Sequence, residues 1–169
     1  NAQWQRAFGT AAEICVLPSE QAVGLPDAVS LEAGATLGIP GLTAAHTVFG
    51  AGDVAGQTLL ISGGAGAVGH NAVQLAKWGG ARVIATASPG AFERVKAAGA
   101  DHVVDYRAPD LAAQILALTD GVGVDRAVEV EFGANIDLLA EVVRANGVIA
   151  AYGSQINMAP TLPFGPMLF

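Results

Sequence analysis

The chain is 169 residues long, enough for one domain with a hydrophobic core, and 52% of its residues are hydrophobic. This hydrophobic content excludes an intrinsically disordered chain. The formal net charge is −7 and only 14% of the residues are charged, which argues against a nucleic-acid-binding protein, because such a protein needs a basic face.

The chain shows no sign of membrane insertion or export. No apolar run approaches the ~20 residues of a membrane-spanning helix and nothing resembles a signal peptide, so we expect a cytoplasmic protein. Because Asn1 is not an initiator methionine, we expect a piece of a longer chain. Cys15 is the single cysteine, which rules out an internal disulfide and a thiolate zinc cluster. We interpret it as a small apolar residue in a short strand at 13–17.

The residues before 51 carry only short elements. Residues 9–24 read as strand and turn, with Pro18 and Pro26 as breaks. Ser30 fits the N-cap of a helix that starts directly after it. A second helix is predicted at 41–49.

From residue 51 onward, apolar strands alternate with helices of about ten residues, which indicates βαβ units and a parallel sheet. The predicted strands lie at 58–62, 82–87, 102–105, 124–130 and 147–152, and the helices at 67–78, 90–98, 109–118 and 134–143. Right-handed crossovers give an α/β, Rossmann-type doubly wound parallel sheet. With the strands numbered along the chain, their expected order across the sheet is 3-2-1-4-5. A complete sheet of this type has six strands, so we expect this one to lack its sixth strand. Three prolines predict an irregular tail at 159–166.

The most informative stretch is 58–70, which reads as a buried strand, a glycine turn and the start of a helix. Gly64, Gly66 and Gly69 fill a G-x-G-x-x-G pattern. The first two would let the backbone turn sharply and approach a ligand, and the third would let the helix pack closely on the strand. Because the open N–H groups of a helix N-terminus favour a pyrophosphate, the pattern predicts a dinucleotide site. The alternative is a merely tight turn.

The end of the second predicted strand bears on which dinucleotide is bound. NAD sites carry an acidic residue about 20 residues past the glycines, which takes the ribose hydroxyls. Here the strand ends in Ser88, whose hydroxyl does not repel a 2′-phosphate, so the sequence favours NADPH. The alternative is that Ser88 only begins the turn before Pro89.

Together with the glycine turn, several segments resemble the quinone oxidoreductase branch of the medium-chain dehydrogenase/reductase family; they lie at 9–13, 37–44, 74–77, 98–102 and 130–135. The resemblance implies an NADPH-dependent, zinc-free reductase of quinones or activated alkenes. It also implies that this chain is part of a longer protein that forms a homodimer. It also implies three parts. They are a remnant of an N-terminal GroES-like catalytic domain at 1–24, linking helices at 25–50 and an NAD(P)-binding Rossmann domain at 51–169.

The resemblance and the ends of the predicted strands suggest the residues that bind the cofactor. The backbone of 65–68 would lie along the pyrophosphate, residues after the fourth strand near the nicotinamide ribose, and residues after the fifth near the nicotinamide. Family positions place Thr43 beside the nicotinamide and Tyr106 near the adenosine phosphate, with a helix cap and an exposed aromatic as the respective alternatives. The predicted cofactor-binding residues are Thr43, Gly64, Ala65, Gly66, Ala67, Val68, Gly69, Ser88, Tyr106, Phe132, Gly133, Asn135, Tyr152, Gly153 and Ser154.

The 2′-phosphate site departs from the family pattern, and Phe132 has an alternative interpretation. Relatives often place a lysine near the 2′-phosphate, where this sequence has Ala91. Arg94 and Arg107 are candidates to replace its charge, and a solvated helix face is the alternative for Arg94. For Phe132 the alternative is a residue packed in the core.

No catalytic residue and no metal ligand is predicted. Glu129 and Glu131 lie two apart on a predicted strand and so share a face, as paired carboxylates would. Because hydride chemistry belongs to the cofactor, we interpret both as structural. The three histidines lack ligand spacing and are interpreted as packing or surface residues: His46, His70 and His102.

The leading hypothesis is the NADPH-binding domain of a zinc-independent quinone oxidoreductase, which transfers hydride to a small-molecule quinone or enone. One alternative is an enoyl-thioester reductase domain of the same superfamily. Another is a non-catalytic NADPH-binding module. Neither a nucleic acid nor a membrane is an expected partner.

Overall fold

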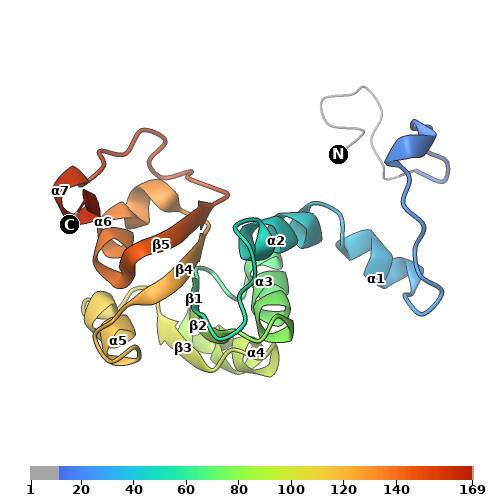
Figure 1. Ribbon diagram of the computed structural model, residues 1–169. Coiled ribbons are helices and arrows are strands. Elements are labelled where there is room, and N and C mark those ends of the chain that lie inside the picture. Colours follow the sequence, from blue (N-terminus) through green and yellow to red (C-terminus); the bar gives the residue numbers. More distant parts are fainter. Residues whose placement is uncertain (1–11, 169) are drawn as a thin grey trace.

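A computed structural model describes residues 12–168, so the expectations for 1–11 and Phe169 lie outside the described residues. Its centre is a five-stranded parallel sheet (Figure 1). The strands are β1 (Thr58–Ile61), β2 (Arg82–Ala87), β3 (His102–Asp105), β4 (Val124–Glu129) and β5 (Val143–Ala151). Their order is β3-β2-β1-β4-β5, which confirms the predicted doubly wound α/β sheet.

The helices connect the strands and cover both faces of the sheet. They are α1 (Leu31–Thr36), α2 (Ile39–Phe49), α3 (Ala67–Trp78), α4 (Phe92–Ala97), α5 (Leu111–Ala117), α6 (Phe132–Val142) and α7 (Phe164–Leu168). Short 3₁₀ turns lie at η1 (Ser19–Gln21) and η2 (Pro89–Ala91). Among residues 12–168, no helix is long and apolar enough to cross a bilayer.

Two apolar clusters form the core, one on each face of the sheet. Leu59 and Ile61 of β1 pack with residues of α2, α3 and α4, whereas Leu60 packs with residues of α5 and α6. Successive side chains of a strand point to opposite faces, so a strand covered on both faces reads as a continuous apolar run. Burying a Leu or Ile side chain fully contributes about 1.5–3 kcal/mol to the free energy of folding, so an apolar β1 stabilises the centre of the sheet.

A buried arginine closes the end of α2 against the sheet. Arg126 lies on β4 and is 2% exposed. Its guanidinium donates hydrogen bonds to the carbonyl oxygens of Val48, Ala51 and Gly52. Because the last carbonyls of a helix have no partner within the helix, Arg126 satisfies the buried carbonyl of Val48 and also bonds two carbonyls that follow the helix.

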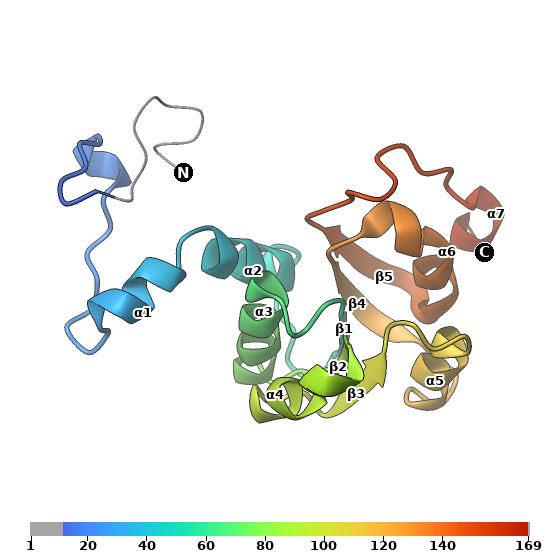
Figure 2. The same cartoon turned by 180° about the vertical axis from the view of Figure 1, so that it is seen from behind.

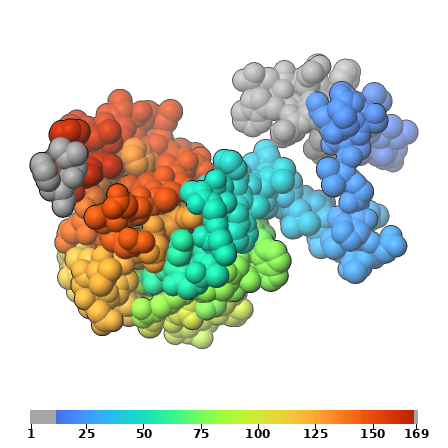
Figure 3. Space-filling model, in the orientation of Figure 1, coloured from blue at the N-terminus to red at the C-terminus, as the bar shows by residue number. Residues whose placement is uncertain are grey.

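The segment before α2 lies apart from the sheet. Ser30 caps α1 as predicted, because its Oγ accepts a hydrogen bond from Ala33 N. The views in Figures 1 and 2 both place α1 away from the sheet, and Figure 3 shows the blue residues as an arm beside the body of the domain. The strand predicted at 13–17 is wrong, since these residues have no regular structure. Apolar alternation yields a strand only when another strand pairs with it.

Two further predictions are corrected near the C-terminus. The last strand begins at Val143, directly after α6, and reaches its regular register with β4 only after an irregularity opposite Val124–Arg126, near Asn146 with its φ of 61°. The tail is not wholly irregular, because α7 includes Pro166. Proline is tolerated in the first turn of a helix, where its missing N–H would have had no partner.

Candidate dinucleotide-binding site

The glycine turn connects β1 to α3 and presents an open helix N-terminus. Gly66 is the N-cap of α3, and no side chain caps it. The first N–H groups of a helix have no partner within the helix and carry its positive dipole end, so they attract an anion. Gly63, at a φ of +67°, and Gly64 donate their N–H groups to Thr86, which ties the turn to the end of β2.

The three glycines of the fingerprint differ in the space around them. A Cβ on Gly69 would overlap the carbonyl group of Gly63 and lie 3.0 Å from Gly64 Cα, so the helix could not approach the turn this closely. A Cβ on Gly64 would lie 3.0 Å from atoms of Ala85 and Val95. Gly66 is exposed, and its nearest neighbour to such a Cβ is Gly63 O at 3.3 Å. The room beside Gly66 is therefore left for a ligand.

A slot of about 340 Å³ opens beside the turn, at the carboxyl ends of β1, β2, β3 and β4. This is the lower end of the size range of ligand pockets. Its walls are mostly apolar, with a few polar groups between them. The lining residues are Ser62, Gly63, Thr86, Tyr106, Leu111, Val130, Glu131, Ala134, Asn135, Leu138 and Ile156. The fold thus brings Tyr106 and Asn135 together.

A buried carboxylate stands behind this slot. Glu129 ends β4 and is 0% exposed. It accepts hydrogen bonds from Ser62 Oγ at 2.5 Å, Glu131 N at 2.5 Å and Asn135 Nδ2 at 2.9 Å. The expectation that Glu129 and Glu131 share a strand face is wrong, because the strand stops at Glu129 and Glu131 is the N-cap of α6. Sequence reasoning missed these contacts, although a carboxylate within an apolar strand is the signal, since a buried charge needs partners.

The loop after β5 is fastened to the start of α6. Gly133 N donates to Ser154 Oγ at 2.8 Å, and Phe132 N donates to Gly153 O at 3.0 Å. Ser154 Oγ donates in turn to Asn157 O. A Cβ on Gly133 would overlap Asn157 O, and one on Gly153 would overlap Val130 O. The N–H groups that open α6 therefore have partners, in contrast to those of α3.

Two titratable side chains border this loop. Glu131 accepts hydrogen bonds from Gln155 N and Ile156 N, and these N–H groups hold the pKa of its carboxyl below the usual value. Tyr152 is half-buried and packs against the core, and its burial together with the negative charge of Glu129 raises its pKa to about 12. Tyr152 therefore stays neutral at physiological pH.

Ser88 and the two candidate arginines are not among the residues that line the slot; they lie after β2, on α4 and after β3. Ser88 follows β2, where its carbonyl accepts from Ala91 N and its side chain makes no capping bond. Arg94 reaches back from α4, and its guanidinium donates to Ala65 O at 2.9 Å. Arg107 is instead paired with Asp105 at 3.2 Å, and the same pairing raises the pKa of Arg107. Of the two cations, Arg94 is the one beside the glycine turn.

Three other residues singled out in the sequence do not line the slot. Thr43 lies in the second turn of α2, where its carbonyl accepts from Thr47 Oγ1, so the alternative of a helix cap is wrong. Phe132 packs against the core cluster of α5 and α6, which supports the core reading for that side chain. His102 contacts Arg82 on the neighbouring strand, with 3.1 Å between Nε2 and the guanidinium.

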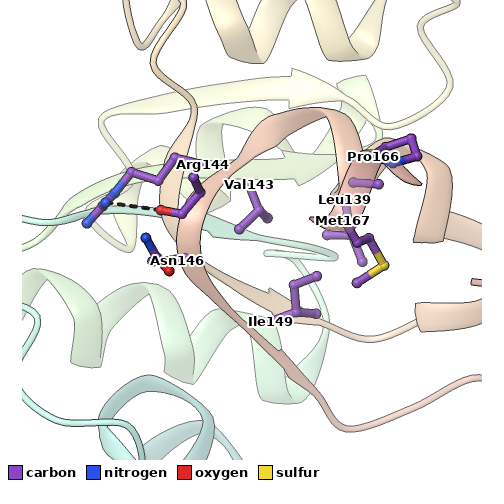
Figure 4. A pocket seen from close by; sticks show the side chains of 10 residues that line it. Leu139, Val143, Arg144, Asn146, Ile149, Pro166 and Met167 are labelled. Atoms are coloured by element: carbon purple, nitrogen blue, oxygen red, sulfur yellow. Dashed lines mark hydrogen bonds between the residues drawn. The ribbon is translucent and has the colours of Figure 1, made fainter. Parts of the chain in front are cut away.

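A separate pocket lies at the outer edge of the sheet (Figure 4). It is formed where the end of α6, the start of β5 and α7 meet, and Leu139, Ile149 and Met167 line it. None of the predicted cofactor-binding residues is among its lining residues. The dinucleotide prediction therefore concerns the slot and the glycine turn.

The described part of the chain lacks the grouped side chains that a zinc ion needs. Zinc is held by three or four His, Cys, Asp or Glu side chains. Between residues 12 and 168, no three such side chains are grouped closely enough to hold a metal ion. The described residues therefore do not fit a zinc site.

The chain matches the family model for zinc-binding dehydrogenases over residues 67–169. It is 40% identical over 136 residues to the trans-enoyl reductase tndF of Aspergillus flavipes, covering 73% of this chain and 39% of that protein. It is 35% identical over 135 residues to a phenolphthiocerol/phthiocerol polyketide synthase subunit of Mycobacterium tuberculosis, covering 79% of this chain and 6% of that protein.

Solved structures are similar as well. An NAD-dependent alcohol dehydrogenase superposes with a TM-score of 0.86 at 35% identity, covering 94% of this chain and 47% of that one. A quinone oxidoreductase of Pseudomonas syringae gives 0.80 at 30%, covering 89% and 47%. A mycobacterial protein solved with NADPH gives 0.76 at 29%, covering 85% and 45%.

The chain spans less than half the length of each of these proteins. The match to the family model covers more than half of this chain, and the superposed structures share its sheet. The chain therefore belongs to the zinc-binding dehydrogenase family, within the medium-chain dehydrogenase/reductase superfamily, and carries its NAD(P)-binding fold.

Proposed function

We propose that this chain binds NADPH, with the pyrophosphate at the N-terminus of α3 and the adenine in the slot. The observation that carries the proposal is an uncapped helix N-terminus that opens beside a largely apolar slot at the carboxyl ends of the strands. In open α/β sheets, ligands bind at this end, where the strand order reverses. This proposal assigns Asn135, which was expected near the nicotinamide ribose, to the adenine instead. The residues after β5, Tyr152 to Ser154, would then lie toward the nicotinamide.

The preference for NADPH over NADH rests on charge. Ser88 brings no carboxylate to the end of β2, and Arg94 brings a cation to the glycine turn. A 2′-phosphate is therefore not repelled at Ser88, and the guanidinium of Arg94 beside the glycine turn can attract it. One related structure contains NADPH, while another is an NAD-dependent enzyme, so relatives differ in their dinucleotide. The preference for NADPH is therefore inferred from Ser88 and Arg94.

Titration calorimetry of the chain with NADPH and with NADH tests this proposal. We expect tighter binding of NADPH, and Arg94→Ala should weaken NADPH about tenfold to hundredfold, because a charge-assisted hydrogen bond contributes about 1.5–3 kcal/mol. Binding of NADH should change little. Lys96→Ala is the matched control, since Lys96 lies on the same helix and pairs with Glu93 at 3.2 Å. Absence of binding, or equal affinities for the two dinucleotides, would contradict the proposal.

For the reaction, we propose reduction of an activated carbon–carbon double bond in an enoyl thioester. Hydride and a proton add across the bond while NADPH is oxidised to NADP⁺, and bound NADPH supplies the hydride. The chain's own part is to orient the dinucleotide and exclude water from it. Support comes from the relatives, which include a trans-enoyl reductase and a polyketide synthase subunit.

A quinone is the second candidate acceptor, and it is supported by the similar quinone oxidoreductase structure. The two are separated by assaying the longer parent protein with a crotonyl thioester and with benzoquinone under the same conditions. Turnover of the thioester alone supports enoyl reduction. Turnover of the quinone alone supports the second candidate, and turnover of neither supports a non-catalytic NADPH-binding module.

A further inference from the structure

Glu129 fixes which atom of the Asn135 side-chain amide faces the slot. A carboxylate accepts hydrogen bonds, and an amide NH₂ group donates them. The 2.9 Å contact between Asn135 and Glu129 therefore assigns Nδ2 to the buried side. The amide is planar, so its oxygen faces the other way, and Asn135 lines the slot. No donor among the described residues bonds to this oxygen.

Glu131 and Ser62 of the slot wall likewise offer a ligand acceptors and not donors. Glu131 is an acceptor whose carboxylate takes the N–H groups of Gln155 and Ile156. The hydroxyl hydrogen of Ser62 is directed to Glu129 and so is not offered to a ligand. Thr86 accepts from Gly63 N and keeps its own hydrogen, which can meet a ring nitrogen of any purine. Apart from the hydroxyl groups of Thr86 and Tyr106, the wall therefore presents acceptors to a ligand.

We infer that Glu129 is a positioning residue that makes the slot selective for a base with an exocyclic amino group. Adenine offers a 6-amino donor to Asn135 Oδ1, whereas hypoxanthine offers a 6-oxo acceptor at the same place. Two acceptors that face each other leave both groups without a hydrogen bond once water is excluded. This selectivity rests on the proposed function, because it presupposes a purine dinucleotide in the slot.

The burial of Glu129 makes the direction hard to reverse. Three groups donate hydrogen bonds to the carboxylate of Glu129, and they come from the end of β1 and from the start of α6. One of them, Ser62, lies 67 residues before Glu129 in the chain. If Asn135 turned its oxygen inward, two acceptors would meet inside the protein. An unmade hydrogen bond in a buried place costs about 1–3 kcal/mol, so the amide stays in one orientation.

The test compares NADPH with reduced nicotinamide hypoxanthine dinucleotide phosphate, which differs from it at the purine 6-position and the adjacent ring nitrogen. Calorimetric titration of the chain should show NADPH binding about tenfold or more tightly. Asn135→Ala should bring the ratio of the two dissociation constants close to one. Damage to the fold alone would weaken both ligands equally and leave the ratio unchanged.

Variants of Glu129 separate positioning from a purely structural role. Glu129→Leu releases the amide and should also bring the ratio close to one. Glu129→Gln should keep it, because its amide oxygen can accept from Glu131 N and Asn135 while its NH₂ group donates to the Ser62 hydroxyl. Asp137→Asn is the control, since Asp137 is exposed on the same helix and does not line the slot.

The outcomes are distinct. Equal affinity of the wild-type chain for the two dinucleotides overturns the inference and leaves the proposed function standing. An unchanged ratio in Asn135→Ala also overturns it, and this variant keeps the test valid if Glu129→Leu does not fold. Binding of neither dinucleotide overturns the proposed function itself.

Discussion

Gly69 tests the reasoning about the glycine turn most directly. In Gly69→Ala, the new Cβ would overlap the carbonyl group of Gly63, lying 2.7 Å from its carbon and 3.0 Å from Gly64 Cα. Ordinary contacts of this kind begin at 3.4 Å, and both neighbours are backbone, which has no rotamer by which to move aside. Either α3 or the turn must therefore shift.

The expected loss of stability follows from two opposing effects. Overpacking a tight contact costs about 1–3 kcal/mol, and replacing glycine by alanine within a helix returns up to ~1 kcal/mol. Because the overlap involves backbone, we expect a net loss of about 2 kcal/mol. For a domain of this length, such a loss lowers Tm by about 4–8 °C. Urea unfolding followed by circular dichroism measures it, with an unchanged m-value as the check that only stability has changed.

Gly66→Ala is the matched control within the same turn. Gly66 has a φ of −76°, which alanine adopts without strain, and its Cβ would meet only Gly63 O at 3.3 Å. We expect the free energy of unfolding to stay within about 0.5 kcal/mol, while NADPH binding is lost because the methyl group occupies the approach to the N–H groups. A Gly69→Ala chain as stable as the wild type would refute this account of the turn.

Two further predictions concern polar side chains outside the turn. Arg126→Ala removes the donor to three carbonyls at the end of α2 and should cost about 3 kcal/mol or more in urea unfolding, with little rescue by Arg126→Lys, whose compact ammonium cannot reach all three. An unaltered urea midpoint would show that these contacts contribute nothing. Because the folded-state pKa of Tyr152 is raised to about 12, the unfolded chain loses this proton first, so stability should fall as pH rises from about 10 to about 12. Tyr152→Phe should remove this part of the alkaline slope, and an identical slope in the variant would contradict the assignment.

The sequence by itself determined the features that depend on neighbours along the chain. The alternation of apolar strands with helices gave βαβ units, and right-handed crossovers then left one strand order, which the structure has. The glycine pattern was readable for the same reason, because the strand, the turn and the start of α3 follow one another within 58–70. Ser30 was likewise recognised from its place next to a helix.

Only the tertiary structure decided which side chains meet. Glu129 and Ser62 lie 67 residues apart, and Gly133 and Ser154 lie 21 apart, so no local pattern pairs them. The slot exists because four strands end at one edge, and its polar wall depends on which atom of Asn135 faces Glu129. Periodicity shows which residues are buried, whereas hydrogen-bond direction is set by contacts between distant segments, and these form only when the chain folds.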